Sequence, residues 1–335
     1  MKARRIRAEG GRVWQDILQR NPGASFFLTP DYAEIAERTL GTPAVCFTFL
    51  CEDGARAVVP TFEKNAGWLR RDLACPGGGL PGGILCDAPL DRARTDGILK
   101  ALAQIPNAAF HLSFEPRDAP CVSASAERTA RRERFFVLDL SDDYADLECR
   151  SFAKDFREQC RKSARRGIRV AFEAGRGPFV EFGNLHRRAS KSWDAASRKP
   201  LAFFAACADV AERTPAVIHL ALARSEQHEG AAVAGLLLVR RGDTVTCWLA
   251  AMNRAASRLA PSAAVYRHGI EWACDQGATR LLLGASGGIA SIEAFKRSMG
   301  AGAIECVTSL EVRGTAREWM RRTRAIASVR PSAGV

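Results

Sequence analysis

Three apolar segments in the second half of the chain constrain the fold more than any other feature. They cover residues 216–223, 231–239 and 243–252, and the short polar sequences EQHEG and RRGD separate them. Apolar runs of this length, with turn-forming sequences between them, are typical of antiparallel strands joined by hairpins. The sequence therefore predicts a three-stranded meander made of AVIHLALA, AAVAGLLLV and DTVTCWLAAM.

Helical patterns surround this meander. A helix over 262–275 is expected directly after it, because Pro261 stands just ahead of the pattern and Gly277 just behind it. The other elements predicted here are helices over 145–166 and 178–196 and strands over 168–173 and 279–284. An order of helix, meander, helix and strand predicts a mixed α/β (α+β) fold.

The first half of the chain shows a fainter version of this order. Residues 30–40 have apolar side chains at helical spacing, with Thr29 as candidate N-cap and Gly41 as stop. The other expected elements are strands 44–50 and 56–62 in a hairpin, an irregular loop 75–89, a helix 91–104, and strands 108–114 and 134–140. The polar stretch 116–134 marks a boundary, so the predicted domains are 1–133 and 134–320, followed by a flexible tail, 321–335.

Charge and composition narrow the classes of partner and site. The formal net charge of +12 attracts anions such as RNA, coenzyme A phosphates, acidic carrier proteins or lipid headgroups, although a generally basic surface without a specific partner is the alternative. The 11 cysteines are scattered and are expected to be free, mostly buried thiols. The histidines lack metal-binding spacing, so no metal site is expected. No segment has the length and apolarity of a membrane span, which predicts a cytoplasmic protein.

The helix expected over 145–166 gives the strongest local signal. A packed stripe is predicted from the apolar residues that recur every four positions: Phe152, Phe156, Cys160 and Ala164. A second row of cations runs beside it: Arg157, Arg161 and Arg165. Such a row suits a phosphate-bearing ligand, whereas a solvated helix face without a ligand is the competing interpretation.

Two further segments have the geometry of anion-binding sites. The helix over 262–275 starts with Ser262 directly after a strand, so its free N–H groups point toward the strand end. The glycine-rich turn within 284–301 holds Ser286 and Gly287 between a strand and a short helix. This turn lacks the GK[ST] ending of a P-loop and the complete GxGxxG of a dinucleotide fold, which disfavours nucleotide hydrolysis and hydride transfer.

Three sequence stretches together resemble the Fem-type, GNAT-fold acyltransferases. They are SFAKDFREQCRKSARRG (151–167), the meander ending in CWLAAMN, and YRHGIEWACDQGATRLLLGASGG with the following FKRSMGA (266–301). The resemblance covers about residues 130–310, and its most specific motif is FKRSMGA. It implies tandem GNAT-like domains around a shared cleft, each a mixed, mostly antiparallel sheet flanked by helices. It also implies direct transfer of an acyl group from an activated donor to an amine, without a covalent enzyme intermediate.

The resemblance assigns roles to individual residues. Lys296, in the FK motif, is expected near the transferred group, where an ammonium stabilises negative charge. The basic row of Arg157, Arg161 and Arg165 is expected to bind phosphate of the donor or the acceptor. The remaining candidates are Ser262, Ser286 and Gly287 for donor binding, Phe295, Trp248 and Tyr266 for substrate binding, and His186, Glu293 and Asp194 as general base.

The sequence does not identify the acyl donor. The first hypothesis is an N-acyltransferase that uses acyl-coenzyme A or an acyl carrier protein and acylates an amino lipid, an amino sugar or a small amine. The second hypothesis is aminoacyl transfer from aminoacyl-tRNA, and the third is a non-catalytic basic module that binds RNA or a carrier. No tightly bound cofactor is expected. A monomer is predicted, with contact at an anionic inner membrane face as a further option.

Overall fold

The computed structural model describes residues 2–7, 12–41, 43–64, 71–76, 80–122, 130–141, 143–193 and 198–314. The chain divides into two compact units. The first unit takes Met1–Asn21, Thr42–Arg132 and Val307–Val335, and the second unit takes Pro22–Gly41 and Glu133–Cys306. Two segments therefore cross the division predicted at residues 133 and 134: residues 22–41 belong to the second unit, and the chain from Val307 belongs to the first. The predicted tail, 321–335, lies outside the described residues.

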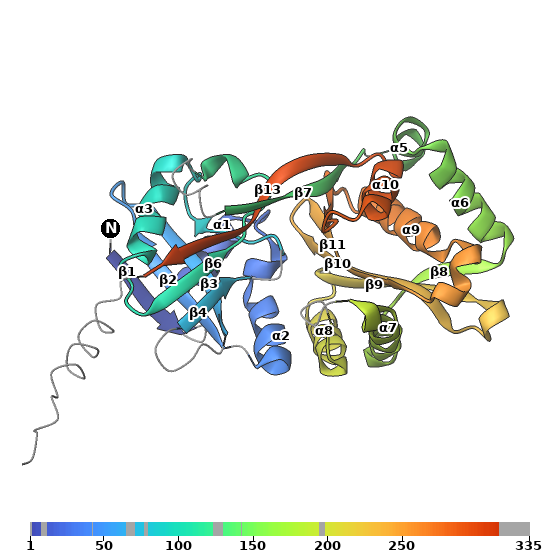
Figure 1. The fold of residues 1–335 in the computed structure, drawn as a ribbon, viewed down its shortest axis with the longest axis horizontal. Helices are drawn as coiled ribbons and strands as arrows, with labels where there is room; N and C mark the ends of the chain where they lie inside the picture. Colours follow the sequence, from blue (N-terminus) through green and yellow to red (C-terminus); the bar gives the residue numbers. More distant parts are fainter. Residues whose placement is uncertain are drawn as a thin grey trace, which may run out of the picture. The chain divides into compact units, whose positions relative to one another are not determined.

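The first unit is built on a mostly antiparallel sheet (Figure 1). Its strand order is β1–β2–β3–β4–β6–β13, with β5 paired to β3. The bounds are β1 Lys2–Arg7, β2 Ala44–Leu50, β3 Arg56–Lys64, β4 Arg71–Cys75, β5 Leu85–Cys86, β6 Ala108–Leu112 and β13 Gly302–Arg313, with helices α1 Arg12–Arg20, α3 Arg92–Leu102 and η3 Ala119–Cys121. β4 and β6 are parallel, and α3 lies between them in the chain.

The strands of the second unit have the order β13–β7–β12–β11–β10–β9–β8. Its strands are β7 Ala130–Asp139, β8 Ile168–Glu173, β9 Ile218–Ser225, β10 Ala232–Arg241, β11 Thr244–Met252 and β12 Arg280–Ala285. Its helices are η2 Phe26–Leu28, α2 Pro30–Leu40, α5 Tyr144–Ser151, α6 Lys154–Arg165, α7 Arg176–Ala189, η4 Ser190–Ser192, α8 Leu201–Arg213, η6 Glu226–His228, η7 Arg254–Leu259, α9 Pro261–Asp275 and α10 Ala290–Ser298. β11 and β12 are parallel.

Helices cover both faces of the sheet formed by the strands of the second unit. Figure 1 shows α6, α9 and α10 over one face and α7 and α8 over the other. β10 lies between these layers and is buried along eight of its ten residues, which explains why its sequence is a continuous apolar run. Gly235 of β10 permits the close approach of α7, because a Cβ there would lie 2.5 Å from the Phe182 ring. The predicted meander and the predicted mixed fold are confirmed.

Several helices differ from their predicted bounds. The single helix expected over 145–166 is broken into α5 and α6 at Phe152 and Ala153, whose ψ angles of 130° and 151° are extended. Within the predicted packed stripe Ala164 is exposed, and Ser163 is buried in its place. α8 was not predicted, since its sequence LAFFAACADVAER is apolar on several sides and shows little helical periodicity.

The predictions for the first half are mixed. Helix α2 has the expected limits: the Thr29 side chain accepts from the Tyr32 N–H, and Gly41 ends it with φ 61°. The hairpin β2–β3 is also confirmed. Strands β1 and β4 and helix α1 were not predicted. All 11 cysteines are free and most are buried, as expected. Among the described residues, no helix has the length and apolarity needed to cross a membrane.

Candidate functional site

The parallel strands β11 and β12 separate after a short paired segment. Residues 244–246 pair with 280–282, and then β12 continues along β7 while β11 continues along β10. From residue 247 to 252, β11 has no strand partner on its β12 side within the described chain. The backbone N–H and C=O groups of this open edge can therefore pair with an extended ligand.

A β-bulge lies where the two strands part. The β10–β11 register shifts between Leu237 and Leu238, so that Trp248 is an extra residue of β11. A bulge twists its strand and redirects the neighbouring side chains. Cys247 packs toward the core under α9, whereas Trp248 contacts Phe203 of α8, on the opposite face.

Helix α9 begins beside the far end of the open edge. Ser262 Oγ lies 3.2 Å from Met252 Sδ, which connects the first turn of α9 to the last residue of β11. The N-cap residue Ala260 has φ 53° and gives no side-chain cap. The N–H groups of Ser262 and Ala263 therefore lack a helical or capping partner. An uncapped helix N-terminus of this kind attracts phosphate through its N–H groups and its dipole.

Exposed arginines lie next to the start of α9. Arg166, just after α6, donates to the carbonyl oxygen of Arg258 in η7. Arg254 and Arg258 are themselves exposed on η7. Because η7 directly precedes α9, these cations add positive charge to an already electropositive helix end.

The three arginines of α6 that were predicted to bind phosphate differ in their surroundings. Arg157 donates to the carbonyl oxygens of Glu148 and Cys149, at 3.3 and 3.1 Å, so its guanidinium holds the α5–α6 break together. Arg161 and Arg165 are exposed. Their function as a phosphate clamp stays a prediction.

Lys296 extends from α10 to the end of β12. Its Nζ donates to the carbonyl oxygens of Gly284 and Ala285, at 2.8 and 2.9 Å, and lies 5.4 Å from the centre of the Phe136 ring. The residue is 5% exposed, and this burial lowers the pKa of Lys296 to about 8. An ammonium carries three N–H groups, so one remains for a ligand beyond the two carbonyl bonds.

A polar cluster supports the turn that Lys296 contacts. Ser286 Oγ donates to Glu293 Oε1 at 2.9 Å, and Arg134 Nη2 lies 3.1 Å from the same oxygen. Ser286 and Glu293 are buried, whereas Gly287 is exposed and has φ 62°, which glycine adopts without strain. Glu293 is thus brought next to Lys296. The donor-binding roles of Ser286 and Gly287 stay predictions.

Aromatic and thiol groups complete this region. The rings of Tyr266 and Phe295 lie 5.4 Å apart, and Phe156 of α6 packs 5.8 Å from Phe295. Burial raises the pKa of the Tyr266 hydroxyl, which keeps it protonated. Burial also raises the pKa of Cys247 to about 12, against the opposing effect of the Lys296 charge. A protonated thiol is a poor nucleophile, which argues against an acyl-enzyme at this cysteine.

His186 does not join this cluster, and its role as a general base stays a prediction. It lies on α7, on the sheet face opposite α9 and α10 (Figure 1). It is fully buried, with ring centroids of Phe182, Trp193 and Phe204 between 5.3 and 6.4 Å away. Neither ring nitrogen has a hydrogen-bond partner among the described residues, and burial lowers the pKa of His186 to about 4. Asp194 lies outside the described residues.

Trp248, predicted to bind substrate, also lies on that opposite face. It is 7% exposed, and aromatic rings surround it: Phe26, Phe27, Tyr32 and Phe203, with centroids 5.1 to 5.9 Å away. The structure therefore does not bring Trp248 together with Lys296, and its role in substrate binding stays a prediction. Its neighbour Cys247 is the residue that β11 presents toward Lys296.

Residues 150–297 match the family described as an acetyltransferase (GNAT) domain. This part of the chain is therefore similar to a GNAT acetyltransferase domain. Its matched range holds the open edge of β11, the start of α9 and Lys296, and leaves out Arg134 and residues 22–41. The resemblance inferred from the sequence motifs is confirmed. A comparison with curated proteins found no match.

Solved structures agree with this domain at the level of the fold. A crystal structure of FemX is 12% identical, with a TM-score of 0.69 over 96% of this chain and 99% of that one. The C-terminal domain of a putative lysylphosphatidylglycerol synthetase from Agrobacterium fabrum is 14% identical, with a TM-score of 0.52 over 98% of each chain. A tandem GNAT protein from the clavulanic acid biosynthesis pathway is 11% identical, with a TM-score of 0.52 over 92% of this chain and 97% of that one.

Sequence reasoning missed two parts of the candidate site. The separation of β11 from β12 was not predicted, although the predicted strands already differed in length, ten residues over 243–252 against six over 279–284. Arg134, which contacts Glu293, was also missed because it precedes its partner by more than 150 residues in the sequence. A longer strand beside a shorter parallel one is the signal that predicts such an opening.

Proposed function

We propose that the GNAT domain transfers an acyl group from a thioester, on coenzyme A or an acyl carrier protein, to an amine. The observation that carries this proposal is the open edge of β11, which begins near Lys296 and ends at the uncapped start of α9. The edge spans residues 247–252, about 17 Å at the usual rise of a strand. That length suits a single extended molecule rather than a compact one.

The chemistry of this edge fits a phosphopantetheine arm. The arm is extended and contains two amides, which can pair with the backbone of β11 as an added strand would. Its phosphate would lie at the N–H groups of Ser262 and Ala263, where the helix dipole and Arg258 favour negative charge. Its thioester would then lie at the Cys247 end of the edge.

Lys296 supplies the charge stabilisation that the reaction needs. The amine nitrogen attacks the thioester carbonyl carbon, so the carbonyl oxygen becomes negative before the C–S bond breaks and the amide forms. The free N–H of the Lys296 ammonium would donate to that oxygen, while its two other bonds keep the side chain fixed. The sulfur leaves as a thiolate and takes up a proton, and the amine loses one. Glu293, next to Lys296, is the candidate to accept it.

The test is an assay of amide formation with purified protein. Acetyl-coenzyme A and longer acyl-coenzyme A thioesters are each supplied with a panel of amino lipids, amino sugars and small amines, and the amide product is measured by mass spectrometry. Aminoacyl-tRNA with the same amines forms a parallel arm. We expect amide in the thioester arm; amide only in the RNA arm would replace the thioester donor. RNA binding without turnover in either arm would favour a non-catalytic module.

Two variants tie turnover to the proposed site. Lys296→Ala removes the ammonium, and Lys154→Ala removes an exposed lysine from α6 as a matched control. Loss of product with the first variant alone supports the assignment. Equal product from Lys296→Ala and the wild-type protein contradicts it.

A further inference from the structure

Residues 22–41 pack against Trp248 of β11, on the face of the sheet opposite Lys296. This segment stands between two stretches of the first unit in the sequence, yet it belongs to the second unit and lies outside the matched GNAT range. We infer that this segment is a positioning element, which holds the β11 bulge and so sets the geometry of the open edge. The expected effect on coenzyme A binding rests on the proposed function, whereas the expected effect on the β11 strand does not.

Aromatic packing makes the first connection. The rings of Phe26, Phe27 and Tyr32 lie 5.5, 5.3 and 5.9 Å from the Trp248 ring, mostly in edge-to-face geometry. All four residues are buried. Edge-to-face pairs of buried rings contribute about 0.5–1.5 kcal/mol each beyond their area burial, so three of them fix the orientation of the indole. Trp248 is thus held from the side of residues 22–41.

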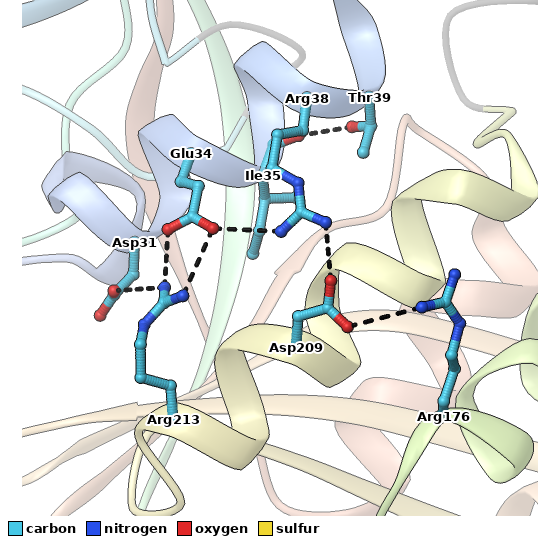
Figure 2. Close-up of polar contacts among 8 residues, drawn as sticks. All are labelled: Asp31, Glu34, Ile35, Arg38, Thr39, Arg176, Asp209 and Arg213. Atoms are coloured by element: carbon cyan, nitrogen blue, oxygen red, sulfur yellow. Dashed lines mark hydrogen bonds and ion pairs between the residues drawn. The ribbon is translucent and has the colours of Figure 1, made fainter.

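Ion pairs make the second connection. Arg38 of α2 binds Asp209 of α8 at 2.6 Å, and Arg213 of α8 binds Glu34 of α2 at 2.6 Å. Figure 2 shows both ion pairs between the two helices. The network continues from Glu34 to Arg38, from Arg213 to Asp31, and from Asp209 to Arg176 (Figure 2). Each such half-exposed pair contributes little alone, about 0–1 kcal/mol, but a network holds two helices in one register.

These contacts converge on the residue that matters for the open edge. Trp248 is the extra residue of the bulge, and it immediately follows Cys247, the first residue of β11 without a partner on the β12 side. Cys247 and Trp248 are adjacent at the bulge and lie on opposite faces, so a shift of the backbone at Trp248 also moves Cys247. Loosening Trp248 would let the bulge shift, and the edge would lose its alignment between Lys296 and α9.

The test removes one ring from the segment and measures β11 directly. Phe27→Ala deletes a contact with Trp248 that does not touch the open edge, and Phe27→Leu restores most of the buried volume. Phe47→Ala is the matched control, because Phe47 is equally buried and packs edge-to-face on an aromatic ring, Phe110, but lies on β2 of the first unit. Amide hydrogen exchange of residues 244–252 reports the strand, and calorimetry with coenzyme A reports the donor site.

We expect Phe27→Ala to raise exchange in β11 and to weaken coenzyme A binding by about 5- to 150-fold, the usual range of coupling between linked sites. Phe27→Leu should recover both, and Phe47→Ala should raise exchange in β2 while leaving β11 and coenzyme A binding unchanged. If Phe27→Ala fails to fold, the double variant Arg38→Gln, Arg213→Gln takes its place, with Arg169→Gln, which breaks an exposed pair with Glu226, as its control.

The outcomes separate this inference from the proposed function. A folded variant with altered exchange in β11 supports the positioning role even if wild-type protein binds no coenzyme A, a result that would instead count against the thioester donor. Unchanged exchange in β11 and unchanged coenzyme A affinity in a folded Phe27→Ala protein overturn the inference.

Discussion

The two units contain the same strand–helix–strand crossover in two different states. In the first unit α3 connects the parallel strands β4 and β6, and these pair along all five residues of β4. The Ser113 N–H donates to the Cys75 carbonyl oxygen, which extends the contact between the two strands beyond β6. In the second unit α9 connects β11 and β12, which pair along only three residues before they separate. One crossover is closed and the other is open.

The helix starts differ in the same direction. The Asp91 side chain caps α3 by accepting from the Arg94 N–H at 2.8 Å, whereas Ala260 leaves α9 uncapped. A carboxylate at a helix N-terminus occupies the N–H groups and repels phosphate, while an uncapped N-terminus attracts it. Topology alone therefore does not provide the features on which the proposed donor site depends. Those features are an open strand edge and a free helix start, and on the described residues the second unit combines them.

The largest expected effect lies at Lys296, in the second unit. Lys296→Ala removes an ammonium hydrogen bond to the developing oxyanion, and the loss of one such donor lowers kcat by about 10²- to 10³-fold. The measurement is steady-state kinetics with the best acyl thioester, with thermal unfolding as a check on folding. A kcat within about threefold of wild type would remove Lys296 from the chemistry.

The same lysine makes the stability of the open unit depend on pH. Its folded-state pKa of about 8 is below the ordinary value of 10.5, so between these values the unfolded chain binds the proton and the folded chain does not. Relative to Lys296→Met, the protein therefore gains about 3 kcal/mol of stability as the pH rises from about 8 to 10.5. Urea unfolding of both proteins across that range measures the difference. Parallel pH curves would show that Lys296 is solvated.

Closing the open helix start chemically is the next test. Ser262→Asp places a carboxylate in the first turn of α9, as Asp91 stands at the start of α3. The carboxylate favours the helix dipole, so folding is unharmed, but it repels the donor phosphate, and we expect KM for coenzyme A donors to rise about tenfold. Ser262→Asn, which has nearly the same shape as the aspartate variant and no charge, is the control. A KM unchanged by the charge would place the phosphate elsewhere.

Elements with strong local patterns could be predicted from the sequence. The meander and α9 have apolar runs bounded by turns, and Lys296 stands in a recognisable motif. The break between α5 and α6 could not be predicted, because neither Phe152 nor Ala153 is a helix breaker; the extended conformation there places Phe152 in the core. Tertiary packing decided that conformation against helix propensity.

The site itself was predicted in part, for a similar reason. Lys296, Glu293, Ser286 and Phe295 share one short segment, so their proximity follows from local structure. His186 and Trp248 were assigned from residue type and from the family resemblance, and which face of the sheet they occupy depends on a bulge and on helix docking. The opening of β11 follows from the unequal lengths of β11 and β12 and not from the pattern within either strand, so only a comparison of the two predicted strands could have indicated it.

The smallest expected effect lies in the closed unit. Asp91→Ala removes the cap of α3, and the loss of such a cap costs about 1 kcal/mol of stability. Because β4 and β6 remain paired along their full length, we expect no new binding of coenzyme A and no change in kcat or KM. Thermal unfolding and kinetics on the same preparation measure both quantities. A change in KM for the donor would contradict this expectation. It would show that an uncapped helix start binds the donor even where the neighbouring strands remain paired.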